Sequence, residues 1–267
     1  MKSNQIEFLN YLSNKKLEVF SPEMVEPFFG KLDNGAYKFL DSLAKRGVLT
    51  NLKKGLYARN PERNIDLVHI PNWHLVASAL VHPKEYYIGY GSALQIHELI
   101  TQPALKEYVV IKKRIQPKIQ SIKGIPFELI FAKSEHFFGF KKTWINDHDK
   151  VYCSDLEKTI IDCLYRPQYA GGLEGIVKAI DTARKKIRQN VLLEYAVSFK
   201  VQAVMKRLGF LLDKMNLYPT EQNILNQLIT ASYTKLDPSI KLKGRFHQKW
   251  RIEDNVDFDD IIQTIHT

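Results

Sequence analysis

Residues 33–59 read DNGAYKFLDSLAKRGVLTNLKKGLYAR, and this stretch decides the fold of the N-terminal part. Asp33 or Asn34 is a typical N-cap, and the apolar side chains that follow recur at helical spacing. The helix is expected to end at Lys45-Arg46-Gly47, where two cations meet the negative helix end and a glycine terminates it. Two short apolar runs then flank a basic, glycine-containing tip, which is typical of a β-hairpin: Val48–Thr50, Asn51–Gly55 and Leu56–Arg59.

The residues before this stretch predict two more short helices. The first covers about Asn4–Ser13 and carries an apolar stripe. The second has Ser21 as its N-cap and Pro22 at its first helical position, and Gly30 stops it. Three helices followed by a two-stranded ribbon are the order of a winged helix-turn-helix. Its core is expected to contain Ile6, Leu9, Phe28, Phe39, Leu40 and Leu43.

A winged helix reads DNA by placing its third helix in the major groove, which is about 12 Å wide and accepts one α-helix. With the apolar residues turned inward, the outward face of this helix carries polar and basic side chains, and the basic hairpin tip can reach phosphates. The alternatives are a small helical domain whose charges are only solvated, and a winged helix that binds protein. The candidate DNA-binding residues are Asn34, Tyr37, Lys38, Ser42, Lys45, Arg46, Lys53, Lys54 and Arg59.

The whole chain has 267 residues, 45% of them apolar, which is enough for a substantial core. Lys and Arg number 39 against 29 Asp and Glu, and the net charge of +10 favours a polyanionic partner such as nucleic acid. No apolar run approaches the roughly 18–20 residues of a membrane-spanning helix, and the first residues do not resemble a secretory signal, so no membrane partner is expected. Cys153 and Cys163 have no zinc-binding spacing and are expected to be reduced thiols in a cytoplasmic protein.

Residues 63–267 are expected to form a second, larger domain after a polar linker at Asn60–Asn64. Its first part, about 70–153, contains strand-like runs such as Val109–Ile111 and Phe127–Phe131, which predict a mixed sheet. Its later part, about 154–232, has three apolar stripes at helical spacing, which are typical of packed helices. The expected fold class is therefore α+β, with a winged helix-turn-helix at 1–62 followed by a larger mixed α/β and helical domain.

Several enzyme motifs are incomplete in this sequence. His97-Glu98-Leu99-Ile100-Thr101 begins like a zinc-protease helix, but Thr101 stands where the second zinc-binding histidine must be. Gly91-Ser92 opens a helix as in nucleotidyltransferases, but no carboxylate pair for Mg²⁺ follows shortly downstream. Asp147-His148-Asp149 is too distant and is expected to be a solvated turn. We therefore expect no enzymatic activity, no metal and no cofactor.

A second basic stretch lies in the helical part, where residues 178–214 hold nine Lys or Arg and three acidic residues. It is either a solvated helix face or a surface that faces DNA, RNA or an acidic partner. The tail that follows is acidic and either lies against this stretch or floats in solvent. Its acidic residues are Glu253, Asp254, Asp257, Asp259 and Asp260.

Motifs along nearly the whole chain occur in the order typical of one family. They are KGLY at 54–57, GSALQIHEL at 91–99, LEKTIID at 156–162 with Gly171-Gly172, RLGFLL at 207–212, LDP at 236–238, and WRI at 250–252 before Asn255-Val256. In this order they resemble the AbiEi-type antitoxins, the regulators of type IV abortive-infection toxin–antitoxin systems. Glu98 departs from the family's pattern, where glycine is common, and Leu156-Glu157-Lys158 replaces a common Pro-Glu-Arg.

The resemblance implies a DNA-binding autorepressor of a phage-defence operon, which recognises an inverted-repeat operator in double-stranded DNA. It also implies a nucleotidyltransferase-like toxin as the functional partner, with no stable complex between the two required. The residues alone leave open a stand-alone transcription regulator whose C-terminal domain senses a ligand, and a nucleic-acid-modifying enzyme. An adjacent nucleotidyltransferase gene would argue against the first, and the incomplete carboxylate set argues against the second.

Overall fold

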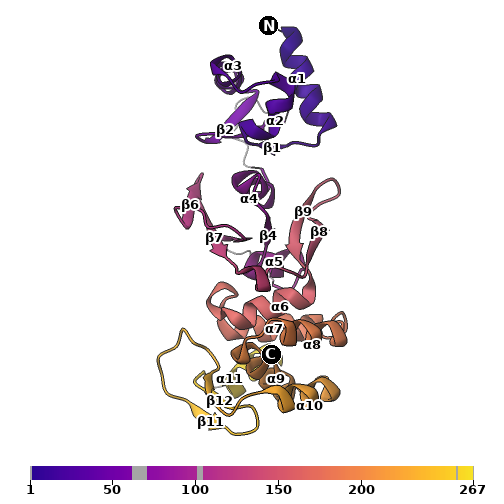
Figure 1. The fold of residues 1–267 in the computed structure, drawn as a ribbon, viewed down its shortest axis with the longest axis vertical. Coiled ribbons are helices and arrows are strands. Elements are labelled where there is room, and N and C mark those ends of the chain that lie inside the picture. The colour runs from indigo at the N-terminus through magenta and orange to yellow at the C-terminus, as the bar shows by residue number, and fades with distance from the viewer. Residues whose placement is uncertain (1, 62–70, 101–104, 257, 267) are drawn as a thin grey trace. The chain divides into compact units, whose positions relative to one another are not determined.

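The computed structural model describes residues 2–61, 71–100, 105–256 and 258–266, and its fold is α+β (Figure 1). The chain divides into two compact units. The first comprises Met1–Ile88, Leu105–Phe131 and Lys142–Tyr152, and the second comprises Gly89–Ala104, Ala132–Lys141 and Cys153–Thr267. The predicted domain boundary at 62/63 and most of the predicted linker lie outside the described residues.

The first unit begins with three helices and a small sheet, as in a winged helix. The elements are α1 (Lys2–Asn14), β1 (Val19–Phe20), α2 (Pro22–Phe29), α3 (Asn34–Lys45), β2 (Leu49–Lys53) and β3 (Leu56–Arg59). The three predicted helices and the hairpin are present, and Gly30 ends α2 with a φ of +73°, which glycine adopts without strain. Strand β1 was not predicted. It pairs antiparallel with β3 and makes the strand order β1-β3-β2.

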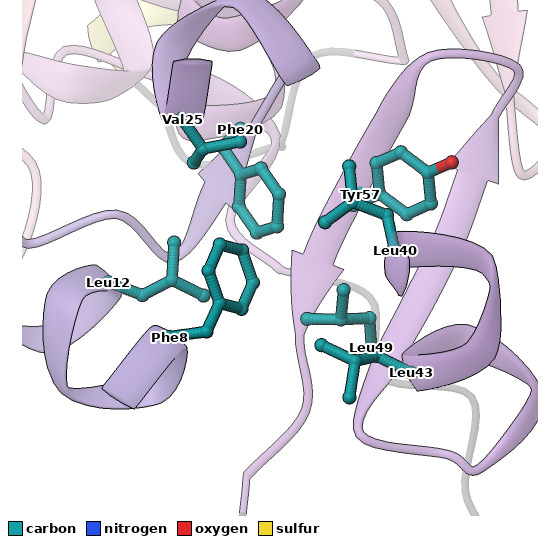
Figure 2. Packing of buried hydrophobic residues seen from close by; sticks show 8 residues of the cluster. All are labelled: Phe8, Leu12, Phe20, Val25, Leu40, Leu43, Leu49 and Tyr57. Carbon is teal, nitrogen blue, oxygen red and sulfur yellow. The ribbon is translucent and has the colours of Figure 1, made fainter. Parts of the chain in front are cut away.

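The winged helix has its own apolar core, to which α1, α2, α3 and the sheet all contribute. Figure 2 shows its buried side chains converging: Phe8, Leu12, Phe20, Val25, Leu40, Leu43, Leu49 and Tyr57. The expectation that Ile6 belongs to this core was wrong, since its side chain is 60% exposed. Phe8 and Leu12, one turn apart, form the inward face of α1, and Ile6 lies about 200° around the helix from Phe8.

Most of a six-stranded sheet also belongs to the first unit, with the order β6-β7-β5-β4-β9-β8. Helix α4 (Trp73–Val81) precedes β4 (Tyr86–Ile88), β5 (Glu107–Ile111), β6 (Ile119–Ile122), β7 (Ile125–Phe131), β8 (Phe140–Trp144) and β9 (Lys150–Ser154). The pairing of β5 with β7 is parallel and that of β5 with β4 is antiparallel. The predicted strand-like runs are strands here, whereas β6 and β9 were not predicted.

The second unit is mainly helical. It contains α5 (Tyr90–Ile96), α6 (Leu156–Tyr165), α7 (Gly172–Ala183), α8 (Gln189–Ser198), α9 (Gln202–Lys214), α10 (Pro219–Leu228) and α11 (Phe258–His266). The three predicted apolar stripes are buried and form its core. Helix α9 is enclosed over most of its length, and Trp250 packs directly on Gly209, where a Cβ would lie 2.0 Å from the indole ring. Two of the family-like motifs therefore meet at a position that only glycine can occupy.

A three-stranded sheet near the C-terminus was not predicted. Its strands are β10 (Thr234–Lys235), β11 (Arg245–His247) and β12 (Ile252–Asp254), in the order β10-β12-β11. The acidic tail that follows packs back on the unit, because Phe258 is buried with its ring 5.4 Å from that of Phe210. Asp259 also pairs with Lys214 of the basic stretch at 3.1 Å. None of the described helices combines the length and the apolar content needed to cross a membrane.

Candidate nucleic-acid interface

The candidate reading helix is α3, and local interactions define where it begins. The carboxylate of Asp33 accepts a hydrogen bond from the backbone N–H of Ala36 at 2.9 Å, as an N-cap does. This hydrogen bond, with one from Gly35, lowers the pKa of Asp33. Ala36, Leu40 and Leu43 are buried against the core, so the opposite face of α3 is left to solvent.

The solvent face of α3 carries four of the predicted DNA-binding residues as exposed side chains: Asn34, Tyr37, Lys38 and Lys45. Asp41 lies on the same helix and accepts a hydrogen bond from the hydroxyl of Tyr57 at 3.0 Å. Burial and this acceptor raise the pKa of Tyr57 to about 12, so the hydroxyl keeps its proton. The bond ties α3 to β3 and therefore fixes the helix relative to the wing.

Ser42 is placed less favourably for base contacts than its neighbours. Its side chain is half-buried, and its hydroxyl donates to the backbone carbonyl of Phe39 at 2.7 Å. The only donor of this side chain is therefore used within the helix in the structure described here.

The wing presents Lys54 at its tip as an exposed side chain beside Gly55, whose φ is +76°. Lys53 is half-buried instead, and its ammonium donates to the side-chain oxygen of Gln120 in β6 at 2.5 Å. Burial also lowers the pKa of Lys53. The two neighbouring lysines thus differ, since only Lys54 extends into solvent.

The two predicted arginines are also hydrogen-bonded within the winged helix. The exposed guanidinium of Arg46 donates to the side-chain oxygen of Gln5 in α1. That of Arg59, half-buried, donates to the hydroxyl of Ser13. Both interactions join positions more than 40 residues apart (separations of 41 and 46), and no sequence signal pointed to them.

The second basic stretch, residues 178–214, is not one continuous surface, because two of its members are buried. Lys206 is fully buried, and its ammonium donates to the hydroxyls of Thr230 and Ser232, each at 3.1 Å. Arg207 is 4% exposed and donates to the backbone carbonyls of Leu164 at 2.7 Å and Lys235 at 3.1 Å. Burial lowers the pKa of Arg207 to about 10. These two residues hold α9 against its neighbours and do not face a partner.

A cluster of charges at the start of α6 uses another member of that stretch. Arg188 pairs with Glu157 at 2.5 Å and with Asp155 at 3.2 Å, joining α6 to the segment before α8. Within α6, the fully buried Lys158 pairs with Asp162, and its ammonium lies 5.1 Å from the centre of the Phe199 ring. Burial lowers the pKa of Lys158. The LEKTIID motif is therefore a packing motif in this unit.

His97, the first residue of the incomplete zinc-protease motif, occupies a structural position. His97 is half-buried, its Nε2 donates to the backbone carbonyl of Ser154 at 2.8 Å, and burial lowers its pKa. Cys153 and Cys163 are both buried and reduced. No group of three or more metal-ligating side chains was found among the residues that the structure describes.

The comparisons with known proteins show a likeness at the level of structure and none at the level of sequence. No family model matches the sequence, and no curated protein sequence matches it. The chain is similar to the Rv2827c protein from Mycobacterium tuberculosis, whose crystal structure superposes with a TM-score of 0.70 over 99% of this chain and 95% of that chain. The two sequences are 12% identical, so the likeness shows a common fold and nothing about function.

Proposed function

We propose that this protein is a DNA-binding autorepressor and antitoxin of a type IV toxin–antitoxin operon. In this proposal the winged helix binds an inverted-repeat operator, and the remainder of the chain counteracts a nucleotidyltransferase-like toxin. The observation that carries the DNA-binding part is the solvent face of α3, which presents Asn34, Tyr37, Lys38 and Lys45 beside the exposed Lys54 of the wing.

The physical fit to DNA supports this part of the proposal. One helix face of polar side chains matches the width of the major groove, and a lysine at the wing tip matches the adjacent phosphates. The net charge of +10 favours association with a polyanion. The antitoxin part rests on the family-like motifs, which run from the wing to residue 256.

The test is a paired assay in cells, with a reporter for the operon's promoter and growth rescue from the co-expressed toxin. In the test variant Lys38, Lys45 and Lys54 are replaced by Ala, and it should lose repression while still rescuing growth, because these exposed residues lie outside both cores. The charge-matched control replaces three exposed lysines outside the winged helix and should keep both repression and growth rescue: Lys84, Lys113 and Lys133.

The outcomes of this assay distinguish the proposed function from its alternatives. Repression with no rescue from any neighbouring toxin would favour a stand-alone transcription regulator and overturn the antitoxin part. A folded triple variant that still represses would overturn the assignment of α3 and the wing as the DNA-binding surface. Failure of that variant to rescue, when supplied from an independent promoter, would show that neutralisation acts through DNA binding.

A further inference from the structure

The outer face of the small sheet β10-β12-β11 exposes aromatic rings. Phe246, in the middle of β11, is 65% exposed, and Tyr233, just before β10, is 40% exposed. Their ring centroids are 4.8 Å apart with an interplanar angle of 75°. The guanidinium of Arg251 lies 5.7 Å from the centre of the Tyr233 ring, so a cation borders the pair. Strands β10 and β12 pack against α9 in the second unit.

The register of the strands explains why these rings face outward. Phe246 stands opposite Glu253, whereas the neighbouring pair, His247 and Ile252, faces the interior. His247 packs on the ring of Phe210 with 5.2 Å between centroids, and Ile252 is fully buried. One face of the sheet is thus anchored to the core, and the other presents side chains to solvent.

The strands and loops that carry the rings have an excess of basic residues. Residues 222–254 contain six Lys or Arg and three acidic residues, of which Asp237 is buried and Glu253 and Asp254 are half-buried. Lys241, Lys243 and Arg245 are exposed, and none of them is in an ion pair with any residue that the structure describes. Exposed cations that make no ion pair within the protein are available to bind an anionic ligand.

The loop that carries two of these cations is held in place. The ammonium of Lys235 donates to the backbone carbonyls of Ile240, Lys241 and Leu242 at 3.3–3.4 Å. Gly244 lies so close to β12 that a Cβ would be 1.9 Å from the carbonyl oxygen of Asp254, and its N–H donates to the carboxylate of Glu253 at 3.2 Å. Glu253, the acidic residue of the outer face, therefore has a hydrogen-bond partner within the protein. Contacts within the protein also hold the loop.

We propose that this face binds single-stranded nucleic acid, with bases stacked on Tyr233 and Phe246. The phosphates would be met by Lys241, Lys243 and Arg251. Exposed aromatic side chains on a sheet, bordered by cations, are the arrangement by which proteins hold unpaired nucleotides. A duplex buries the faces of its bases in the stack, so it cannot use the two rings. The site is separate from the winged helix and does not depend on the function proposed above.

The test measures binding of fluorescein-labelled 12-mers of oligo(U) and oligo(dT) to the full chain by anisotropy, beside a duplex of the same length. Stacking of one base on an aromatic ring is worth about 1–3 kcal/mol, so Phe246→Leu should weaken single-strand binding about 5- to 150-fold. Phe246→Trp should preserve the affinity, because it keeps an aromatic surface. The matched control is Trp144→Leu in β8, which also replaces an exposed aromatic ring by leucine, since Trp144 is 55% exposed.

Charge is tested separately with Lys241→Ala and Lys243→Ala. Each lost phosphate contact should reduce the slope of log K against log salt by about 0.7 for a single strand. Preference for oligo(U) or oligo(dT) identifies RNA or DNA as the ligand, and either supports the site. Equal affinity of the wild type, Phe246→Leu and Trp144→Leu for the 12-mers would overturn the proposal, as would an equal loss of duplex and single-strand binding by Phe246→Leu.

Discussion

Replacing Lys54 by Ala should remove one phosphate contact without disturbing the winged helix. Lys54 is exposed at the wing tip, and exposed substitutions usually change stability by less than about 0.5 kcal/mol. A lysine that neutralises one phosphate of duplex DNA contributes about 0.9 to the slope of log K against log salt. The same relation gives a loss of about 8-fold in affinity at 0.1 M salt and about 15-fold at 0.05 M.

Lys53 provides an internal comparison, because the structure gives it a different environment. Its ammonium donates to Gln120, so leaving this partner for a phosphate has a cost that Lys54 does not have. Lys53→Ala should therefore reduce the slope of log K against log salt by less than Lys54→Ala. The double variant should reduce this slope by about 1, instead of the about 2 expected if both lysines contacted phosphates equally.

The assay is a titration of fluorescent operator and random duplexes at several salt concentrations, with Lys113→Ala as the control for an exposed lysine elsewhere. Both duplexes should be weakened equally, since a phosphate contact does not read sequence. An unchanged slope for Lys54→Ala would show that the wing does not touch DNA. Equal slope losses for Lys53→Ala and Lys54→Ala would refute the reasoning from Gln120.

Three further predictions concern stability. Leu40→Ala empties a fully buried position in the winged-helix core and should lower its free energy of unfolding by about 2–5 kcal/mol, measured by denaturant titration; a loss below about 1 kcal/mol would contradict the packing. Lys158→Met should cost about 3–5 kcal/mol by breaking its buried ion pair with Asp162, and Asp162→Leu added to it should restore part of the loss; a double variant less stable than the single one would argue against a simple pair. Hydrogen bonds lower the pKa of Asp33 below its ordinary 3.8, so its contribution is complete above that pH and is lost as the pH falls through the lowered pKa. The melting temperatures of wild type and Asp33→Ala should thus differ near pH 7 and converge in strong acid, and a constant gap would show that the carboxylate is not responsible.

Local signals were sufficient for the winged helix. The N-cap at Asp33, the spacing of Ala36, Leu40 and Leu43, and the glycine at the wing tip all act within a few residues of chain, so their consequences could be predicted. Strand β1 has two residues, too few for a periodic pattern, and forms because Val19 and Phe20 pair with β3. The misplacement of Ile6 has a similar cause: the apolar residues of α1 are spread around more than one side of the helix, and only the position of the core decides which of them are buried.

The candidate DNA-binding residues also differ in how far the sequence predicts their surroundings. Exposure of Asn34, Tyr37, Lys38 and Lys45 follows from helical periodicity alone. The partners of Lys53, Arg46 and Arg59 do not, because they lie between 41 and 67 residues away along the chain.

The sequence by itself therefore determined the order of the helices in the winged helix, the solvent face of α3, and the basic character of the chain. Each of these depends on interactions within one or two helical turns or on composition. Only the tertiary structure decided that Lys206 and Arg207 are buried and that Arg188 binds Glu157. It alone also assembled the aromatic face of Tyr233 and Phe246. A charged side chain looks the same in a sequence whether it faces water or a distant carbonyl, and that choice depends on which segments the folded core brings together.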